Sequence, residues 1–206
     1  DRENRRPVGR ETREALRRHV DRGLETCDAV LVSDYGSGLV TPELVEGLMA
    51  TRARLGLRVP VLLDSRYQLD RFRGLTACTP NESELEHVLD VTVGDDPEAL
   101  EKAGRTLLRR TRMTAVLVTR GSRGMALFER GKPTRHLPIF GSDEIADVTG
   151  AGDTVIATTT LALASGASFT EAARIANYAG GLVVMKRGTA TISADELRRA
   201  VRDDLG

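Results

Sequence analysis

Neither sign of charge predominates in this sequence, because 30 lysine and arginine residues are matched by 30 aspartate and glutamate residues. Proteins that bind nucleic acids generally carry a basic surface, so this balance argues against a nucleic-acid partner and favours a small molecule. No segment is apolar over the length that crosses a bilayer, and the first residues are too polar for a signal peptide. We therefore expect a cytoplasmic protein with no membrane partner.

Cysteine is scarce as well. Cys27 and Cys78 have no metal-ligand spacing to each other or to the three histidines. A reducing compartment also disfavours a disulfide between them. We expect both thiols to be buried as small apolar side chains.

The chain of 206 residues is long enough for one well-buried domain, and it shows no internal repeat or linker. Short runs rich in Val and Leu alternate with segments of helical period, which is the pattern of an α/β fold with a parallel sheet. The predicted strands are residues 29–33, 60–63, 115–119 and 125–128. The first three are continuously apolar, so we place them in the interior of the sheet, covered on both faces.

Helix starts are marked by capping residues. Thr41 and Asp96 each precede a proline, a pairing typical of the first helical turn. Two further starts carry the capping-box pairs Ser168/Glu171 and Ser193/Glu196.

The most informative segment is residues 147–153, Asp-Val-Thr-Gly-Ala-Gly-Asp, which runs directly into a helix of small residues over 154–164. A glycine turn at a helix start presents unpaired backbone N–H groups and the positive end of the helix dipole, so it can bind phosphate without a cationic side chain. Gly150, Ala151 and Gly152 are the predicted anion hole.

Asp153 stands at the start of that helix, where the dipole favours an ionised carboxylate that can accept the proton of an attacking hydroxyl. That role suits phosphoryl transfer, which needs positioning and charge stabilisation more than a strong base. The structural alternative is a tight turn with Asp153 as a helix cap. The Walker pattern fails because no Lys-Ser or Lys-Thr pair follows, and Val155 replaces the third glycine of the dinucleotide fingerprint.

Four motifs in order resemble those of the ribokinase-like (PfkB) carbohydrate kinases, over nearly the whole chain. They are Ser-Asp-Tyr-Gly at 33–36, Thr-Pro-Asn-Glu-Ser-Glu at 79–84, Thr-Arg-Gly-Ser-Arg-Gly at 119–124 and the turn at 147–153. The resemblance implies a three-layer sandwich with a mostly parallel central sheet. It makes residues 1–206 the C-terminal nucleotide-binding and catalytic portion of a kinase domain that uses ATP and Mg²⁺.

Within that family the chain is most similar to the kinase domain of the bacterial heptose-phosphate enzymes that make ADP-heptose. The motifs at 33–36 and 79–84 and the closing Gly-Thr-Ala-Thr-Ile-Ser at 188–193 carry this likeness. It implies phosphorylation of O1 of D-glycero-D-manno-heptose 7-phosphate. It also implies a homodimer or a fusion with an adenylyltransferase domain.

The resemblance assigns roles to single residues, with Asp153 as the base. Asn81 and Glu84 match an Asn-x-x-Glu motif that organises Mg²⁺ through water, in keeping with the preference of Mg²⁺ for oxygen ligands and retained waters. A capped helix start with an acidic first turn explains this pair equally well. Asp34 belongs to the substrate side.

The remaining assignments concern the nucleotide and a second cation. Thr119, Gly121 and Gly124 match positions that contact the nucleotide, although a plain hairpin turn is the competing explanation. Asn177 matches a side chain near the adenine or ribose, or else is a solvent-facing or interhelical Asn. Asp147 and Thr149 match residues that hold a monovalent cation such as K⁺ in some relatives.

The sequence departs from the heptose kinases on the substrate side. Ser37 stands where they carry Lys, and Ser65-Arg66 follows Asp64 where they carry Pro-Lys. The first residues resemble an internal point of the family, just after the lid, so we expect a chain that lacks the N-terminal strands and lid of the family. The alternatives are another sugar or nucleoside kinase of the family, a non-catalytic nucleotide-binding module, and a dinucleotide oxidoreductase, which the missing third glycine disfavours.

Overall fold

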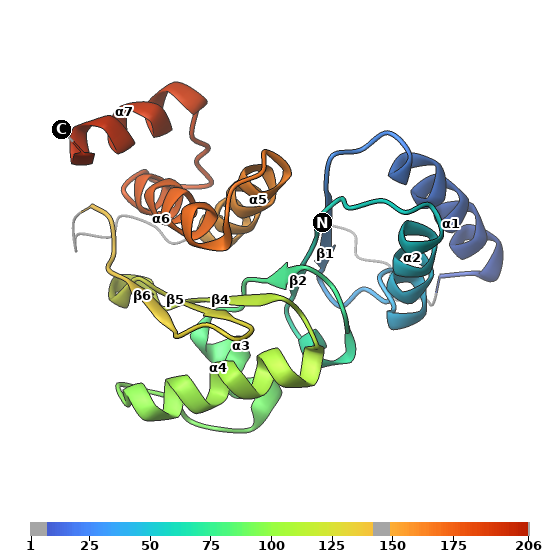
Figure 1. The fold of residues 1–206 in the computed structure, drawn as a ribbon, viewed down its shortest axis with the longest axis horizontal. Coiled ribbons are helices and arrows are strands. Elements are labelled where there is room, and N and C mark those ends of the chain that lie inside the picture. Colours follow the sequence, from blue (N-terminus) through green and yellow to red (C-terminus); the bar gives the residue numbers. More distant parts are fainter. Residues whose placement is uncertain (1–7, 142–148, 206) are drawn as a thin grey trace.

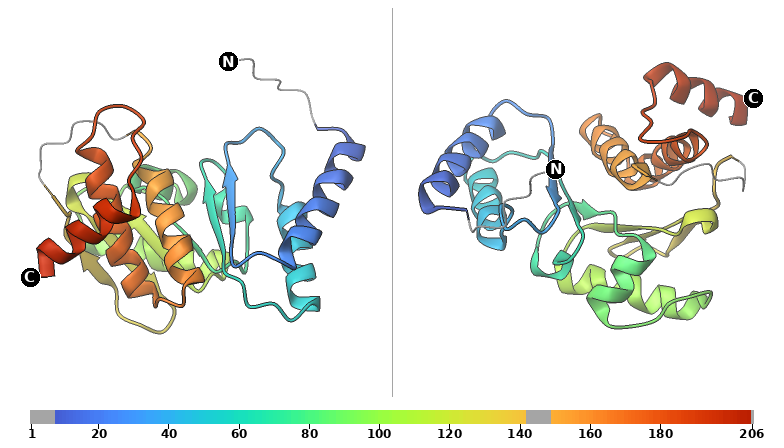
Figure 2. Two further views of the ribbon diagram at one scale, coloured as in Figure 1. Left: turned by 90° about the horizontal axis from the view of Figure 1, so that it is seen from above. Right: turned by 180° about the vertical axis from the view of Figure 1, so that it is seen from behind.

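The computed structural model describes residues 8–141 and 149–205, which form a central sheet with helices on both faces (Figures 1 and 2). The strands are β1 Val30–Asp34, β2 Val61–Ser65, β3 Ala77–Cys78, β4 Ala115–Thr119, β5 Met125–Glu129 and β6 Arg135–Leu137. The helices are α1 Arg10–Leu24, α2 Pro42–Arg54, α3 Glu82–Leu89, α4 Pro97–Thr111, α5 Ala151–Ala164, α6 Phe169–Val184 and α7 Ala194–Leu205. Two 3₁₀ turns lie at Leu69–Arg71 and Gly121–Arg123.

Within the described residues the sheet has six strands in sequence order. β1 to β4 pair parallel, β5 pairs antiparallel with β4, and β6 pairs antiparallel with β5. The predicted α/β class and mostly parallel sheet are therefore confirmed. The four predicted strands agree to within two residues at each end, and β3 and β6 were missed because β3 is two residues long and β6 carries exposed polar side chains.

Successive side chains of a strand point to opposite faces of the sheet, so the strands contribute to two separate hydrophobic cores. Val61 and Leu63 of β2 pack in one core with α1 to α4, and Leu62 between them packs in the other with α5 and α6. Figure 1 shows α3 and α4 on one face of the sheet and α5 and α6 on the opposite face. The expected three layers are present.

The prediction that 29–33 lies in the sheet interior was wrong. β1 is the first strand of the sheet and pairs with β2 alone among the described residues. Its Leu31 side chain is 40% exposed, and Ser33 is exposed as well. An apolar run does not reveal how many neighbours a strand has, which only the assembled sheet decides.

Several local predictions hold. The side chains of Thr41, Asp96, Ser168 and Ser193 accept hydrogen bonds from the backbone of their helices. Cys78 is fully buried as expected, but Cys27, three residues after α1, is only half-buried. None of the described helices is both long and apolar enough to span a membrane.

Helix α4 approaches the sheet through Gly104. A Cβ atom at this position would lie 2.3 Å from Cζ of Phe128, whose side chain is fully buried. We expect Gly104→Ala to lower the free energy of unfolding by about 1–3 kcal/mol through overpacking.

Urea denaturation measures this change, with Gly23→Ala in α1 as the control. A Cβ at Gly23 meets no atom within 4 Å. That variant should be unchanged or more stable by about 0.4–1 kcal/mol, because alanine restricts the unfolded chain. Equal effects of the two substitutions would contradict the close packing at Gly104.

Candidate active site

A cleft of about 630 Å³ lies at the carboxyl ends of the parallel strands, where α/β sheets bind ligands. Asp34 ends β1, Asp64 lies near the end of β2, and Thr119 ends β4. The start of α5 closes the cleft from the other layer. All site residues predicted from sequence that the structure describes line this cleft, namely Asp34, Asn81, Glu84, Thr119, Gly121, Gly124, Thr149, Gly150, Ala151, Gly152, Asp153 and Asn177. Asp147 lies outside the described residues.

The glycine turn forms the predicted helix start. Gly150 is the N-cap of α5, with φ of +80° and no side-chain capping bond. This left-handed conformation favours glycine. Thr154 donates its backbone N–H and its hydroxyl to the carbonyl of Gly150, at 3.0 and 2.9 Å. Because the first helical N–H groups have no intrahelical acceptor, the turn offers them to an anion in the cleft.

Asp153 is exposed to the cleft in the first turn of α5. The hydroxyl of Tyr35 donates a hydrogen bond to its Oδ1 atom at 3.3 Å. Tyr35 was not singled out from sequence, although it stands within the motif at 33–36. This hydrogen bond joins the segment after β1 to the first turn of α5, which is 118 residues further along the chain.

Asp34 has a supporting position in the cleft wall. Its side chain is 5% exposed, Oδ2 accepts from the Ser65 hydroxyl at 2.8 Å, and Oδ1 accepts from the Gly36 N–H at 2.9 Å. Ser65, one of the departures from the family pattern, thus binds the carboxylate that ends β1. The bond from Ser65 ties the end of β1 to the end of β2, and the bond from Gly36 fixes the turn that follows β1.

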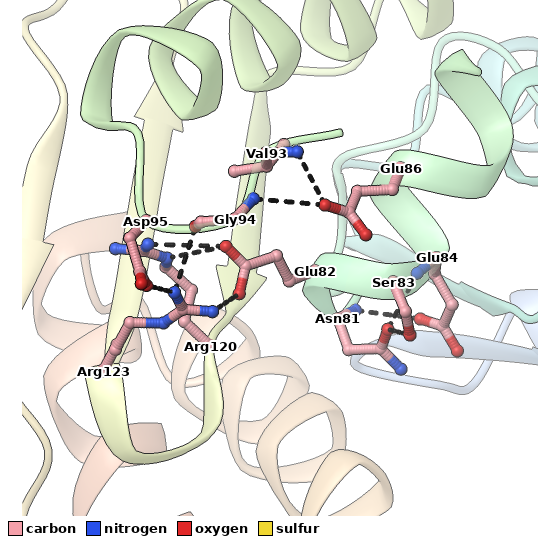
Figure 3. Close-up of polar contacts among 10 residues, drawn as sticks. All are labelled: Asn81, Glu82, Ser83, Glu84, Glu86, Val93, Gly94, Asp95, Arg120 and Arg123. Atoms are coloured by element: carbon pink, nitrogen blue, oxygen red, sulfur yellow. Dashed lines mark hydrogen bonds and ion pairs between the residues drawn. The ribbon is translucent and has the colours of Figure 1, made fainter. Parts of the chain in front are cut away.

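Asn81 and Glu84 fit both of their interpretations. Asn81 is the N-cap of α3, and its Oδ1 accepts the Glu84 N–H at 2.8 Å, while Glu84 Oε2 accepts the Asn81 N–H at 2.9 Å (Figure 3). Both residues also line the cleft. The capping box therefore holds both side chains at the cleft wall, and it is compatible with a role in binding Mg²⁺.

Carboxylates dominate the charge of the cleft. Asp34, Asp64, Glu84 and Asp153 line it, and Arg66 is the one lysine or arginine among its described lining residues. The pKa of Asp64 is raised to about 6, first by burial and then by the neighbouring Glu84 and Asp153 charges, against the opposing Arg66 charge. Sequence reasoning missed Asp64 as a site residue. Its position after an apolar strand was the available signal.

The arrangement of carboxylates suits a cation that is held mainly by water and by phosphate oxygens. No three His, Cys, Asp or Glu side chains of the described residues come close enough to form a metal cage. Mg²⁺ commonly retains several waters and binds one or two carboxylates together with phosphate oxygens, so a cleft with separated carboxylates fits it.

On the nucleotide side, Thr119 ends β4 and the glycines of the next turn have φ of +57° at Gly121 and +75° at Gly124. A Cβ at Gly124 would lie 2.0 Å from the Leu137 carbonyl oxygen, so the β5–β6 hairpin itself requires this glycine. Asn177 donates its Nδ2–H to the Pro138 carbonyl at 2.8 Å. Its interhelical interpretation was wrong, because its partner is in the segment after β6.

An apolar wall completes the cleft and was not predicted. Its residues are Met125, Ile139, Val155, Gly180, Gly181 and Val184. The glycine pair inside α6 was the available signal, since helix interiors disfavour glycine. A Cβ at Gly181 would lie 2.3 Å from the Phe140 carbonyl oxygen, so α6 and the segment after β6 touch through backbone.

The resemblance to the carbohydrate kinases extends from the motifs to most of the chain. Residues 4–196 match the model of the pfkB family carbohydrate kinases. The chain belongs to this family. Among curated relatives, the bifunctional protein HldE of Geobacter sulfurreducens is 38% identical over 198 residues, covering 96% of this chain and 40% of the relative. The HldE protein of Alcanivorax borkumensis is 44% identical over 188 residues, covering 91% and 38%.

Solved structures show the ribokinase-like fold. Phosphofructokinase-2 from Escherichia coli in complex with potassium matches with a TM-score of 0.77 at 20% identity, covering 96% of this chain and 63% of that chain. Ribokinase of Arabidopsis thaliana, complexed with ribose and ATP, matches with a TM-score of 0.72 at 23% identity, covering 95% and 60%. The chain thus spans about 40% of the length of the curated relatives above and over half of these solved chains.

The raised pKa of Asp64 predicts a stability effect. Its value of about 6 lies above the ordinary 3.8, so the folded protein binds more protons than the unfolded chain between these values. The ionised carboxylate therefore costs stability above pH 6, and the cost fades as the pH falls towards 4. We expect Asp64→Asn to raise the melting temperature at pH 8 and to raise it less at pH 5.

Thermal denaturation from pH 5 to 8 checks this, and Asp203→Asn on the exposed part of α7 corrects for the loss of one carboxylate. A gain independent of pH, or a loss of stability at pH 8, would contradict the assigned burial and repulsion.

Proposed function

We propose that the native protein transfers the γ-phosphoryl group of ATP to a sugar hydroxyl, with Asp153 as general base. The observation that carries this proposal is the exposed Asp153 carboxylate in the first turn of α5, beside the left-handed Gly150 cap and facing the cleft. Membership of the pfkB carbohydrate kinases supports the reaction class. A general base and an anion-binding helix start both assist phosphoryl transfer to an alcohol.

In this mechanism the Asp153 carboxylate accepts the hydroxyl proton as the sugar oxygen bonds to the γ-phosphorus and ADP leaves. The Tyr35 hydroxyl, which donates to Asp153 in the present structure, orients the carboxylate until the acceptor hydroxyl takes that place. The N–H groups of the turn at 150–152 stabilise the charge on the transferred group. Mg²⁺, when bound, neutralises phosphate charge, and Asn81 and Glu84 would hold it through water.

The nucleotide would lie along the other half of the cleft. Thr119, Gly121 and Gly124 bring backbone close to it at the end of β4. Asn177 and the apolar wall would face its base and ribose. This placement keeps the triphosphate between the turn of α5 and the start of α3, where the acidic cleft needs a bridging cation.

As acceptor we propose O1 of D-glycero-D-manno-heptose 7-phosphate, in ADP-heptose biosynthesis. The motif likeness to the heptose kinases and the similarity to proteins named bifunctional protein HldE support it. Asp34 and Arg66 line the cleft. We assign both to its substrate side, where Arg66 is a candidate contact for the sugar phosphate. A fusion with an adenylyltransferase domain, a homodimer and a cytoplasmic location belong to the same proposal.

A monovalent cation such as K⁺ is a further proposed component, held by Thr149 of the cleft wall and Asp147. The potassium complex of the phosphofructokinase-2 structure supports it. The alternative acceptor is another sugar, which Ser37 favours, because this residue lacks the charge that the heptose kinases present to a sugar phosphate. A panel of sugars, tested on native protein of verified intact mass, separates these two candidates.

Asp153→Asn tests the base. We expect turnover in the native protein to fall by about 10²-fold or more, because general-base catalysis contributes at least that much, with ATP affinity retained. Kinetics at saturating MgATP and calorimetry of nucleotide binding measure the two quantities. Retained turnover would exclude Asp153 as the base.

Gly152→Val tests the anion hole. A Cβ at Gly152 meets no protein atom within 4 Å, so the added side chain would disturb the bound phosphate rather than the fold. We expect nucleotide affinity and turnover to fall together while the melting temperature changes little. Unchanged affinity would show that the turn is only structural.

A further inference from the structure

The side chain of Glu82 bridges two separate parts of the cleft wall. Glu82 is the first residue of α3, and its Oε1 accepts hydrogen bonds from Nε and Nη2 of Arg120, both at 3.4 Å. Its Oε2 accepts a further bond from Nη2 of Arg123 (Figure 3). One carboxylate thus joins the start of α3 to Arg120, which precedes the 3₁₀ turn Gly121–Arg123, and to Arg123, which ends it.

These side chains tie the turn to the start of α3. The backbone hydrogen bonds described for 120–124 stay within the hairpin, from Arg120 N–H to the Gly124 carbonyl, from Arg123 to Arg120, and from Gly124 to Gly121. Between the turn and α3 lies a second hollow of about 410 Å³, which Glu82, Arg120 and Arg123 help to line. The ion pairs cross this hollow, where close packing does not hold the turn.

The bridge stands beside the point where two strand ends meet. Asn81 and Thr119 form a parallel β-bridge, and the Thr119 N–H donates to the Pro80 carbonyl at 2.9 Å. Glu82 and Arg120 are the next residues on the two segments. The ion pair therefore extends the contact from the paired backbone to the glycine turn, whose Gly121 and Gly124 line the main cleft.

The ion pair between Glu82 and Arg120 is largely shielded from solvent. The side chains of Glu82 and Arg120 are each 12% exposed. Removing one member of such a pair leaves the other charge poorly solvated, which is costly. Arg123 also binds Asp95, but the Asp95 side chain is 93% exposed, so that contact contributes little.

We propose that Glu82 is a positioning residue for nucleotide binding. It holds the glycine turn at a set distance from Asn81 and Glu84, so that one nucleotide can reach the turn with its base end and the start of α3 with its phosphates. This inference rests on the proposed function and adds a residue that contacts neither ligand.

Glu82→Gln in the native protein tests the inference. Loss of the charge weakens the contacts to Arg120 and Arg123, although Arg123 keeps its bonds to the Gly94 carbonyl and Asp95. We expect the KM for MgATP and the Kd for MgADP to rise about tenfold, which is less than half of the free energy that breaking a buried pair can cost. Turnover at saturating MgATP should fall far less, because Asp153 is untouched. Steady-state kinetics and calorimetry with MgADP provide the readings.

Two further variants complete the design. Asp95→Asn, on the exposed arm of the same cluster, should leave both constants unchanged. Glu82→Gln combined with Arg120→Gln should weaken binding by less than the product of the single effects, because the two residues act through one contact. If Glu82→Gln does not fold, Arg123→Gln replaces it, since this side chain is 40% exposed, and a weaker shift in the same direction is expected.

The outcomes separate the two proposals. Native protein that binds no MgADP and transfers no phosphate would overturn the proposed function and this inference with it. An active native protein whose Glu82→Gln or Arg123→Gln variant binds MgADP normally would overturn the inference alone. An equal change in Asp95→Asn would also overturn it, because a general loss of surface charge would then explain the result.

Discussion

The packing of α5 against the sheet is the constraint on which the cleft depends. Val155 and Ile156 of this helix are buried in one core with Leu62 of β2, and this contact sets the start of α5 over the carboxyl ends of the parallel strands. Gly150 can then turn the chain into the helix with its N–H groups facing the cleft. If α5 were shifted along the sheet, the anion hole and Asp153 would move away from the strand ends together.

The negative charges in the cleft destabilise the folded protein, but they suit the binding of a cation. Four carboxylates line one cleft, and burial together with their mutual repulsion raises the pKa of Asp64. A protein selected only for stability would neutralise such a group, whereas sites that bind cations and transfer charged groups tolerate the cost. Hydrogen bonds from Ser65 and Gly36 to Asp34 keep one of the four in place.

Several residues combine a structural and a functional position. Asn81 and Glu84 cap α3 through reciprocal hydrogen bonds and line the cleft through the same geometry. Gly124 is required by the β5–β6 hairpin and also lies against the cleft. A structural explanation for such a residue does not exclude a ligand contact, because a rigid support is what a binding residue needs.

The amino-acid sequence by itself determined the α/β class, the helix starts and the glycine turn, because these depend on local periodicity, capping and backbone freedom. Its motifs also named the predicted residues that line the cleft. The tertiary structure decided what depends on contacts between distant segments, namely the edge position of β1, the antiparallel β5 and β6, and the raised pKa of Asp64. The apolar wall and the Glu82 bridge also depend on the tertiary structure. No local sequence pattern tells which side chains meet when separate strand ends come together at one edge of a sheet.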